Sequence, residues 1–262
     1  VDAVSWRVLL EELATRYAGE EPPPPTASFQ QWSEALARHA TSPALLAERD
    51  YWREQAEGPA GLLPRDATVD VATDAPASRS LTTELSAEQT SALLQQVPRA
   101  YGTRADEALL AALTAALATF TGDDRVRVEV EGHGREEQLL GEDLTRTVGW
   151  FTTMYPVLLE RQTGDASATL RWVKDTLRRV PNRGLGYGLL PSSGSRSAGG
   201  VLFNYLGQAG ARTPLGEGGL ASEGVGELQS PETRRRHAIS VDAWVAGGRL
   251  CVRWSYDARR FA

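Results

Sequence analysis

The sequence predicts an α+β fold, in which helices pack on a mixed β-sheet. Strand-like runs with alternating valines and charged residues, as at 125–131, share the chain with runs of helical spacing. These elements do not follow the strict strand–helix–strand order of a parallel α/β protein. The chain has 262 residues, 41% hydrophobic and 24% charged, which is ordinary for a globular protein with one large or two small cores.

The first part of the chain predicts helices only. Apolar residues recur at helical spacing in three runs: 4–17, Ser28 to about His39, and Ser42 to about Gln55. Pro22 to Pro25 form an extended linker after the first run, and Pro43 suits the first position of the third helix. Residues 57–77 are rich in Gly, Pro, Asp and Ala, which is typical of a connection between two lobes.

The remaining chain mixes strands and helices. The strands are expected at 79–85, 125–131, Val148 to Leu159, 200–206, and in a hairpin of 238–245 and 250–256 around Gly247 and Gly248. The helices are expected at 87–96, about 103–120, and 167–179. The second of these is almost all Ala and Leu, so it should be buried on several sides. A glycine-rich loop is expected at 207–226.

Composition argues against several classes of function. The net charge of −6 disfavours a nucleic-acid partner, and the one basic cluster, Arg234 to Arg236, is interpreted as a solvated loop. No apolar run approaches the roughly 20 residues of a membrane span, and no signal peptide opens the chain. A single cysteine, Cys251, indicates a reducing compartment and a cytoplasmic location. Three dispersed histidines and no phosphate-binding glycine loop predict neither a metal site nor a bound cofactor.

The stretch from Val128 to Glu137 carries the strongest functional signal. It is a strand whose valines face a core while its charged residues face the other way. Gly132 and Gly134 then break the strand, beside His133. A carboxylate at such a strand end is well placed for proton transfer, and Glu131 is the candidate. A charged strand end that faces solvent is an equally open alternative.

Four strings occur in the order typical of a known family: Glu131-Gly132-His133-Gly134-Arg135-Glu136, Arg146-Thr147-Val148-Gly149-Trp150-Phe151-Thr152, Tyr155-Pro156-Val157 and Phe203-Asn204-Tyr205-Leu206-Gly207. Asp2-Ala3-Val4-Ser5-Trp6-Arg7 is similar to the tail of the condensation-superfamily signature HHxxxD. Over nearly its whole length, the chain therefore resembles the epimerization domains of nonribosomal peptide synthetases. The first two strings are characteristic of epimerization domains rather than condensation domains.

The resemblance implies the two-lobed fold of chloramphenicol acetyltransferase. Residues 1–57 would end the N-terminal lobe, 58–77 would link the lobes, and 78–262 would form the C-terminal lobe. In the family pattern two histidines lie four and five residues before Asp2, which places them upstream of Val1. This chain is therefore expected to carry half of the active site, and a helix after Phe261 is expected to be missing.

The resemblance also implies epimerization at Cα of an aminoacyl or peptidyl thioester, held on the 4'-phosphopantetheine of a carrier protein. Glu131 is expected to act as base or acid on one face, and the missing histidine on the other. Asn204 and Tyr205 would hold the substrate or the oxygen of the intermediate. The supporting residues would be Asp2, which orients its loop through hydrogen bonds or an arginine partner, His133, Arg135, Arg146, and Trp150 in the channel wall.

An upstream peptidyl carrier protein domain and a downstream condensation domain are the partners that the resemblance implies, with no nucleic acid, membrane or metal. Two alternatives to epimerization stay open. The first is a condensation domain that forms peptide bonds, and the second is a non-catalytic scaffold that recruits a partner enzyme. The residues do not identify the amino acid that is inverted.

Overall fold

The computed structural model describes residues 1–64, 78–137, 141–190, 200–208 and 235–261. The helices are α1 (Ala3–Tyr17), α2 (Phe29–His39), α3 (Pro43–Ala47), α4 (Arg49–Glu57), α5 (Ala87–Ser91), η1 (Ala92–Gln96), α6 (Val97–Tyr101), α7 (Ala105–Thr121), α9 (Ala166–Arg178), η2 (Pro181–Gly184) and η3 (Tyr187–Leu189). The strands are β1 (Ser78–Glu84), β2 (Arg125–Gly132), β3 (Thr153–Glu160), β4 (Val201–Gln208), β5 (Ile239–Ala246) and β6 (Arg249–Asp257). The predicted α+β class is confirmed.

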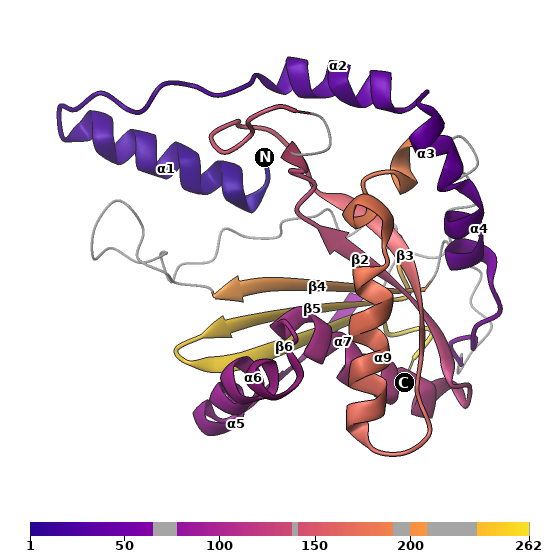
Figure 1. The fold of residues 1–262 in the computed structure, drawn as a ribbon. Coiled ribbons are helices and arrows are strands. Elements are labelled where there is room, and N and C mark those ends of the chain that lie inside the picture. The colour runs from indigo at the N-terminus through magenta and orange to yellow at the C-terminus, as the bar shows by residue number, and fades with distance from the viewer. Residues whose placement is uncertain (65–77, 138–140, 191–199, 209–234, 262) are drawn as a thin grey trace.

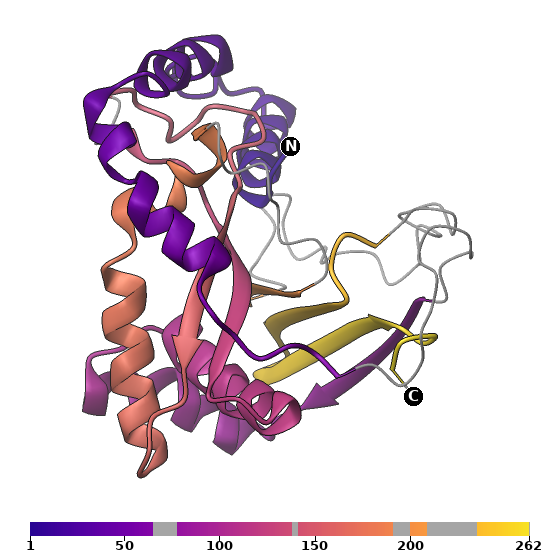
Figure 2. The same cartoon turned by 90° about the vertical axis from the view of Figure 1, so that its right-hand side faces the viewer.

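The six strands form one mixed sheet in the order β1-β6-β5-β4-β2-β3. Strand β4 pairs in parallel with both β2 and β5, while the other pairs are antiparallel. Helices α7 and α9 pack against each other and against β3 on one side of the sheet, and α4 lies along β3 at the sheet edge (Figures 1 and 2). The N-terminal helices α1 and α2 lie beyond the end of β2 (Figure 1).

The core lies between the sheet and α7, as the apolar patterns predict. Val126, Val128 and Val130 of β2 are buried, and so are alternate residues along β5. Helix α7 buries residues around most of its circumference, which confirms the expectation from its Ala and Leu content. Burial of each large aliphatic side chain contributes about 1.5–3 kcal/mol to the stability of this layer.

The prediction of a strand from Val148 to Leu159 was wrong for its first five residues, because β3 begins at Thr153. The backbone of Gly149 is instead bonded to the start of α1: its carbonyl accepts from Asp2 N and Ser5 Oγ, and its N–H donates to Ser5 Oγ. A Cβ at Gly149 would lie 2.2 Å from the ring of Phe29. This segment therefore forms its hydrogen bonds with α1 rather than with a neighbouring strand.

Two helix boundaries also differ from the prediction. The helix expected at 87–96 continues to Tyr101 through the π-helical turn η1, which accommodates Pro98 near the start of α6, and Gly102 ends it with φ +61°. The helix expected from Ser42 to Gln55 breaks at Glu48 into α3 and α4. Glu48 is buried at this junction, and its carboxylate makes the contacts described below.

Two predicted loops fall largely outside the described residues, namely 65–77 of the interlobe connection and 209–226 of the glycine-rich loop. Residues 207 and 208 of the latter belong to β4. The described part of the connection lies against the start of β2, where Gly61 N donates to Arg125 O. Within the described ranges no helix is long and apolar enough to cross a membrane.

Candidate active site

The candidate base Glu131 lies where strands β2 and β4 separate. The two strands pair in parallel only over Val128–Val130 and Val201–Phe203. One residue further along each strand, the side chains bridge the gap, because Asn204 Nδ2 donates to Glu131 Oε2 at 2.7 Å. Two of the predicted catalytic residues, which are 73 positions apart in the chain, therefore meet through a direct hydrogen bond.

The surroundings of Glu131 favour its protonated form. Burial raises the pKa of this carboxyl, and the nearby carboxylate of Asp242 raises it further, while His237 opposes the shift. Asp242 lies beside Asn204 in the register of β4 and β5. Glu129, on the same side of β2, is only 4% exposed. The alternative of a strand end that faces solvent does not fit this half-buried, charge-rich environment.

A polar pocket of about 640 Å³ opens at the same place. Its walls come from the end of β2, the start of α7, the end of α9 and strand β4, and include Glu131, His133, Arg104, Tyr155 and Tyr205. Burial raises the pKa of Tyr155 to about 12, so this phenol remains protonated. Pockets of this size commonly hold small ligands.

Tyr205, the third predicted catalytic residue, lines this pocket but does not lie beside Asn204. Successive strand side chains point to opposite sides, so Tyr205 faces the start of α7 while Asn204 faces Glu131. Burial raises the pKa of Tyr205, and the carboxylate of Asp106 raises it further. The structure thus divides the Asn-Tyr pair between the two sides of β4.

Arg135 joins the glycine-broken loop after β2 to the start of α1. Its guanidinium donates to Asp2 Oδ1 at 3.1 Å and to Ser5 Oγ at 3.0 Å, and both charged side chains are 8% exposed. It also donates to the carbonyls of Leu144 and Thr147, and it stacks 4.0 Å from the centre of the Phe151 ring. Asp2 has the arginine partner that its predicted orienting role requires.

Asp2 has two further roles at this junction. Its Oδ1 accepts from Ser5 N at 2.8 Å and so caps α1, and its Oδ2 accepts from Phe151 N at 3.3 Å. Burial alone raises the pKa of Asp2, but hydrogen bonds from Ser5 and Arg135 outweigh it and hold this pKa below its ordinary value. The carboxylate is therefore suited to orientation rather than to proton transfer.

The other predicted supporting residues are more exposed. Arg146 forms ion pairs with Glu11 at 3.4 Å and Glu12 at 3.1 Å, and so attaches the far side of α1 to the same loop. His133 Nδ1 accepts from Arg135 N at 3.0 Å, so this histidine supports the loop. Trp150 is 66% exposed and does not line the pocket described above.

Glu48, at the break between α3 and α4, holds the turn that forms another wall of the pocket. The Glu48 carboxylate accepts from Asn182 Nδ2 at 2.6 Å and from Trp52 Nε1 at 2.8 Å. Asn182 and Arg183 both have left-handed backbone conformations, with φ of 44° and 49°. Such conformations cost energy outside glycine, so Glu48 holds a strained turn whose Arg183 side chain lines the pocket.

The sequence prediction missed a buried histidine–glutamate pair near Glu131. His237 Nε2 lies 2.7 Å from Glu129 Oε2, and both side chains are 5% exposed. The pair was missed because 108 positions separate its members. The interpretation of Arg234 to Arg236 as a solvated loop was wrong for Arg235, whose guanidinium donates to Ser78 Oγ and Ser255 O. Arg234 lies outside the described residues.

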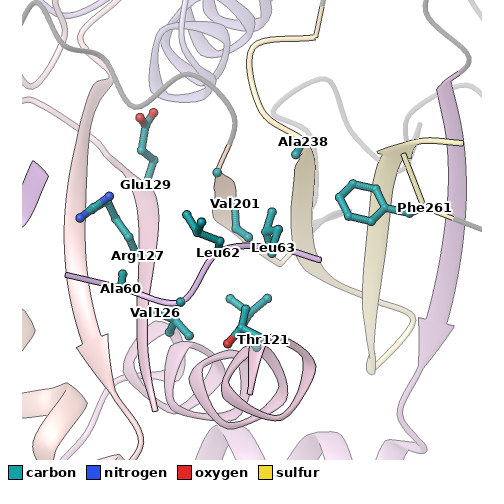
Figure 3. A pocket seen from close by; sticks show the side chains of 13 residues that line it. Ala60, Leu62, Leu63, Thr121, Val126, Arg127, Glu129, Val201, Ala238 and Phe261 are labelled. Carbon is teal, nitrogen blue, oxygen red and sulfur yellow. The ribbon is translucent and has the colours of Figure 1, made fainter. Parts of the chain in front are cut away.

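A second pocket of about 520 Å³ lies toward the start of β2 (Figure 3). Its lining is mostly apolar and includes Leu62, Leu63, Val201 and Phe261. In Figure 3 the carboxylate of Glu129 points away from these side chains. In the part of the chain that the structure describes, no three His, Cys, Asp or Glu side chains are grouped as metal ligands.

Comparison with known proteins supplies the family context. The family model for the condensation domain matches residues 1–262. Chondramide synthase of Chondromyces crocatus is 43% identical over 98% of this chain, and bacitracin synthase 3 of Bacillus licheniformis is 38% identical over 100%. The matches span 7% and 4% of those two proteins, so the chain corresponds to a small part of each.

Solved structures agree with this result. The epimerization domain from the third module of tyrocidine synthetase B is 32% identical, with a TM-score of 0.88 over 100% of this chain and 62% of that one. The condensation domain from Monacolin K polyketide synthase shares the fold alone, with a TM-score of 0.73 at 15% identity over 100% of this chain and 62% of that one. These likenesses confirm the predicted condensation-type fold.

Proposed function

The chain belongs to the condensation domain family, and from this premise we propose that it is the C-terminal part of an epimerization domain in a peptide synthetase. Its substrate would be an aminoacyl or peptidyl thioester on the 4'-phosphopantetheine of an upstream carrier protein domain. The product would be a mixture of L and D forms for a downstream condensation domain. The division into lobes at 1–57, 58–77 and 78–262 is part of this proposal.

The observation that carries the proposal is the hydrogen bond between Asn204 and Glu131, whose side chain lines a pocket rich in charged residues. A carboxylate with an ordinary pKa of about 4.3 is a weak base at neutral pH. Burial raises the pKa of Glu131, which brings it closer to the range in which a group can both accept and return a proton. Asn204 fixes the carboxylate by donating to one oxygen, which leaves the other oxygen for the Cα proton.

In the proposed reaction, the Glu131 carboxylate removes the Cα proton, and the electron pair of that bond moves into the thioester carbonyl. The resulting enolate is protonated at Cα from the opposite face. The second proton-transfer group would be a histidine of the pair that the resemblance places upstream of Val1. The Asp2–Arg135 contact holds the start of α1 against the loop that follows Glu131.

Deuterium wash-in tests this proposal. The full-length domain is incubated in heavy water with an L-aminoacyl thioester on its carrier, and deuterium at Cα and the L/D ratio are measured. We expect exchange with formation of both enantiomers, and a loss of about 100-fold or more in Glu131→Gln. Glu160→Gln is the matched control, because Glu160 lies at the far end of β3 and pairs with Arg125.

The alternatives predict different results. A condensation domain would join two loaded carriers into a peptide without Cα exchange. A scaffold would show neither reaction with any loaded carrier. Full exchange in Glu131→Gln would refute the role of this carboxylate even if the domain epimerizes.

A further inference from the structure

Glu129 and His237 form a buried pair beside the candidate base. Glu129 lies two residues before Glu131 in β2, so the two side chains leave the same face of the strand about 7 Å apart. The 2.7 Å contact between His237 Nε2 and Glu129 Oε2 supplies a hydrogen bond that a buried carboxylate requires. The side chains of this pair are 5% exposed, so bulk water screens the pair weakly.

The segment that carries His237 is fixed at both of its ends. Arg235 bonds to Ser78 and to the carbonyl of Ser255, on β1 and β6. Ala238 N donates to Gly200 O at 3.0 Å, next to the start of β4. Between these anchors the chain crosses the sheet face, and His237 reaches across β4 to β2. The imidazole therefore has a defined position over the same face that carries Glu131.

We propose that His237 is a positioning residue. Glu129 holds its imidazole near Glu131, where a charge on the imidazole acts electrostatically on the Glu131 carboxylate. The inference rests on the proposed function, in which Glu131 exchanges a proton with substrate. A protonated imidazole stabilises the ionised carboxylate, whereas Asp242 and burial favour its neutral form. The balance between these effects would keep Glu131 able both to accept and to return a proton.

Other charged groups also surround Glu131, and the test must separate them from His237. On the strands they are Glu129 and Asp242, and on the segment before β5 they are Arg235 and Arg236. Around the pocket they are Arg104, Asp106, His133, Glu136, Arg178 and Arg183. A substitution at His237 replaces none of these residues, but Glu129 contacts His237 directly and Arg236 lies 3.9 Å from the same Glu129 oxygen. The effect of the imidazole charge is therefore read from the difference between a neutral and a positively charged replacement.

The first test is the pH dependence of Cα exchange in the full-length domain. His237→Gln keeps an amide donor for Glu129 but removes the ionisable ring. We expect the acid limb of the rate profile to move to higher pH, by about 0.4 to 1.7 units if the imidazole lies as far from Glu131 as Glu129 does, because that is the effect of one charge about 7 Å away at effective dielectric constants of about 80 to 20. His237→Lys, which keeps a positive charge, should restore much of the shift. His39→Gln, at the end of α2, is the matched control.

The second test does not depend on activity. The carboxyl carbon of Glu131 is followed by NMR in protein labelled with ¹³C-glutamate, and Glu131→Gln assigns the signal. We expect its midpoint to rise in His237→Gln, and the wild-type signal to move again at the pH where the His237 ring proton titrates. That wild-type measurement remains available if the variant does not fold.

The outcomes separate the two proposals. Coupled titration without Cα exchange would sustain the inference and refute epimerization. If Cα exchange occurs, but its acid limb and the Glu131 midpoint are the same in His237→Gln as in His39→Gln, epimerization stands and the role of His237 is overturned. Absence of a second Glu131 transition in the wild-type protein would also overturn it.

Discussion

Replacement of Asp2 by Asn should release α1 from the loop that follows β2. Only Ser5 and Val8 of this helix are buried, so apolar contact contributes little to its attachment. The helix is held instead by polar contacts: the buried Asp2–Arg135 ion pair, the bonds of Ser5 to Gly149, and the more exposed ion pairs of Arg146 with Glu11 and Glu12. Asn preserves the size of the side chain and the oxygen that caps Ser5 N, while the negative charge is lost.

The expected cost follows from burial. Arg135 would remain 8% exposed with no anion against it, and removal of one member of a buried ion pair costs about 3–5 kcal/mol. Each 1.4 kcal/mol is a factor of about ten, so the protection of α1 amides against hydrogen exchange should fall by roughly 100-fold or more. Asp2→Ala should cost about 1 kcal/mol more, because it also removes the helix cap.

Asp165 provides the control for this experiment. It caps α9 by accepting from Ala168 N at 3.1 Å, but no buried arginine pairs with it among the residues that the structure describes. Asn is as good a cap as Asp, so Asp165→Asn should leave the protection of α9 within a few-fold of wild type. If Asp2→Asn lowers protection of α1 no more than this, the ion pair does not hold the helix and the reasoning is refuted.

Acid should have the same effect as the substitution. The folded pKa of Asp2 lies below its unfolded value, so the contribution of Asp2 is fully present above about pH 4. It is lost only as the pH falls through the lower, folded value. Exchange measured from pH 5 downward should therefore show α1 protected at pH 4 and released at more acid pH.

Three further predictions concern single groups. Gly134→Ala should destabilise the protein by about 1–3 kcal/mol more than Gly122→Ala in urea unfolding. Both glycines have left-handed backbone, but of the two only Gly134 lies where a Cβ would meet a backbone oxygen, that of Phe151, at 1.7 Å. Equal losses of stability in the two variants would contradict this. Glu107→Gln should lower the free energy of unfolding by about 1.5–3 kcal/mol in the same assay, because this fully buried carboxylate accepts charge-assisted bonds from Arg104 and Arg178. An unchanged free energy of unfolding would show that water replaces the carboxylate at both arginines without cost. The rate of Cα exchange should decline on the acid side at a pH above 4.3, because burial raises the pKa of Glu131, and a decline below that value would exclude it as the base.

Much of the fold could be predicted from local patterns. The period-two alternation around Val128 and the Ala and Leu content of 103–120 identify elements whose burial the structure confirms. Capping residues such as Ser86 mark helix starts, because their side chains satisfy backbone N–H groups within the next turn. Errors arose where distant residues competed for the backbone, as at Gly149, which bonds to α1.

The sequence by itself determined the class of fold, the core strands and the candidate carboxylate, since these depend on residue type and short-range periodicity. Only the tertiary structure decided which groups surround that carboxylate. Asn204 and His237 reach the face of β2 because β4 lies next to β2 in the sheet and β5 lies next to β4, although the two residues are 73 and 106 positions from Glu131 along the chain. The pKa of Glu131 depends on its burial and on the charges of all its neighbours. These neighbours meet only when the chain folds, so no local pattern in the sequence encodes their combined effect.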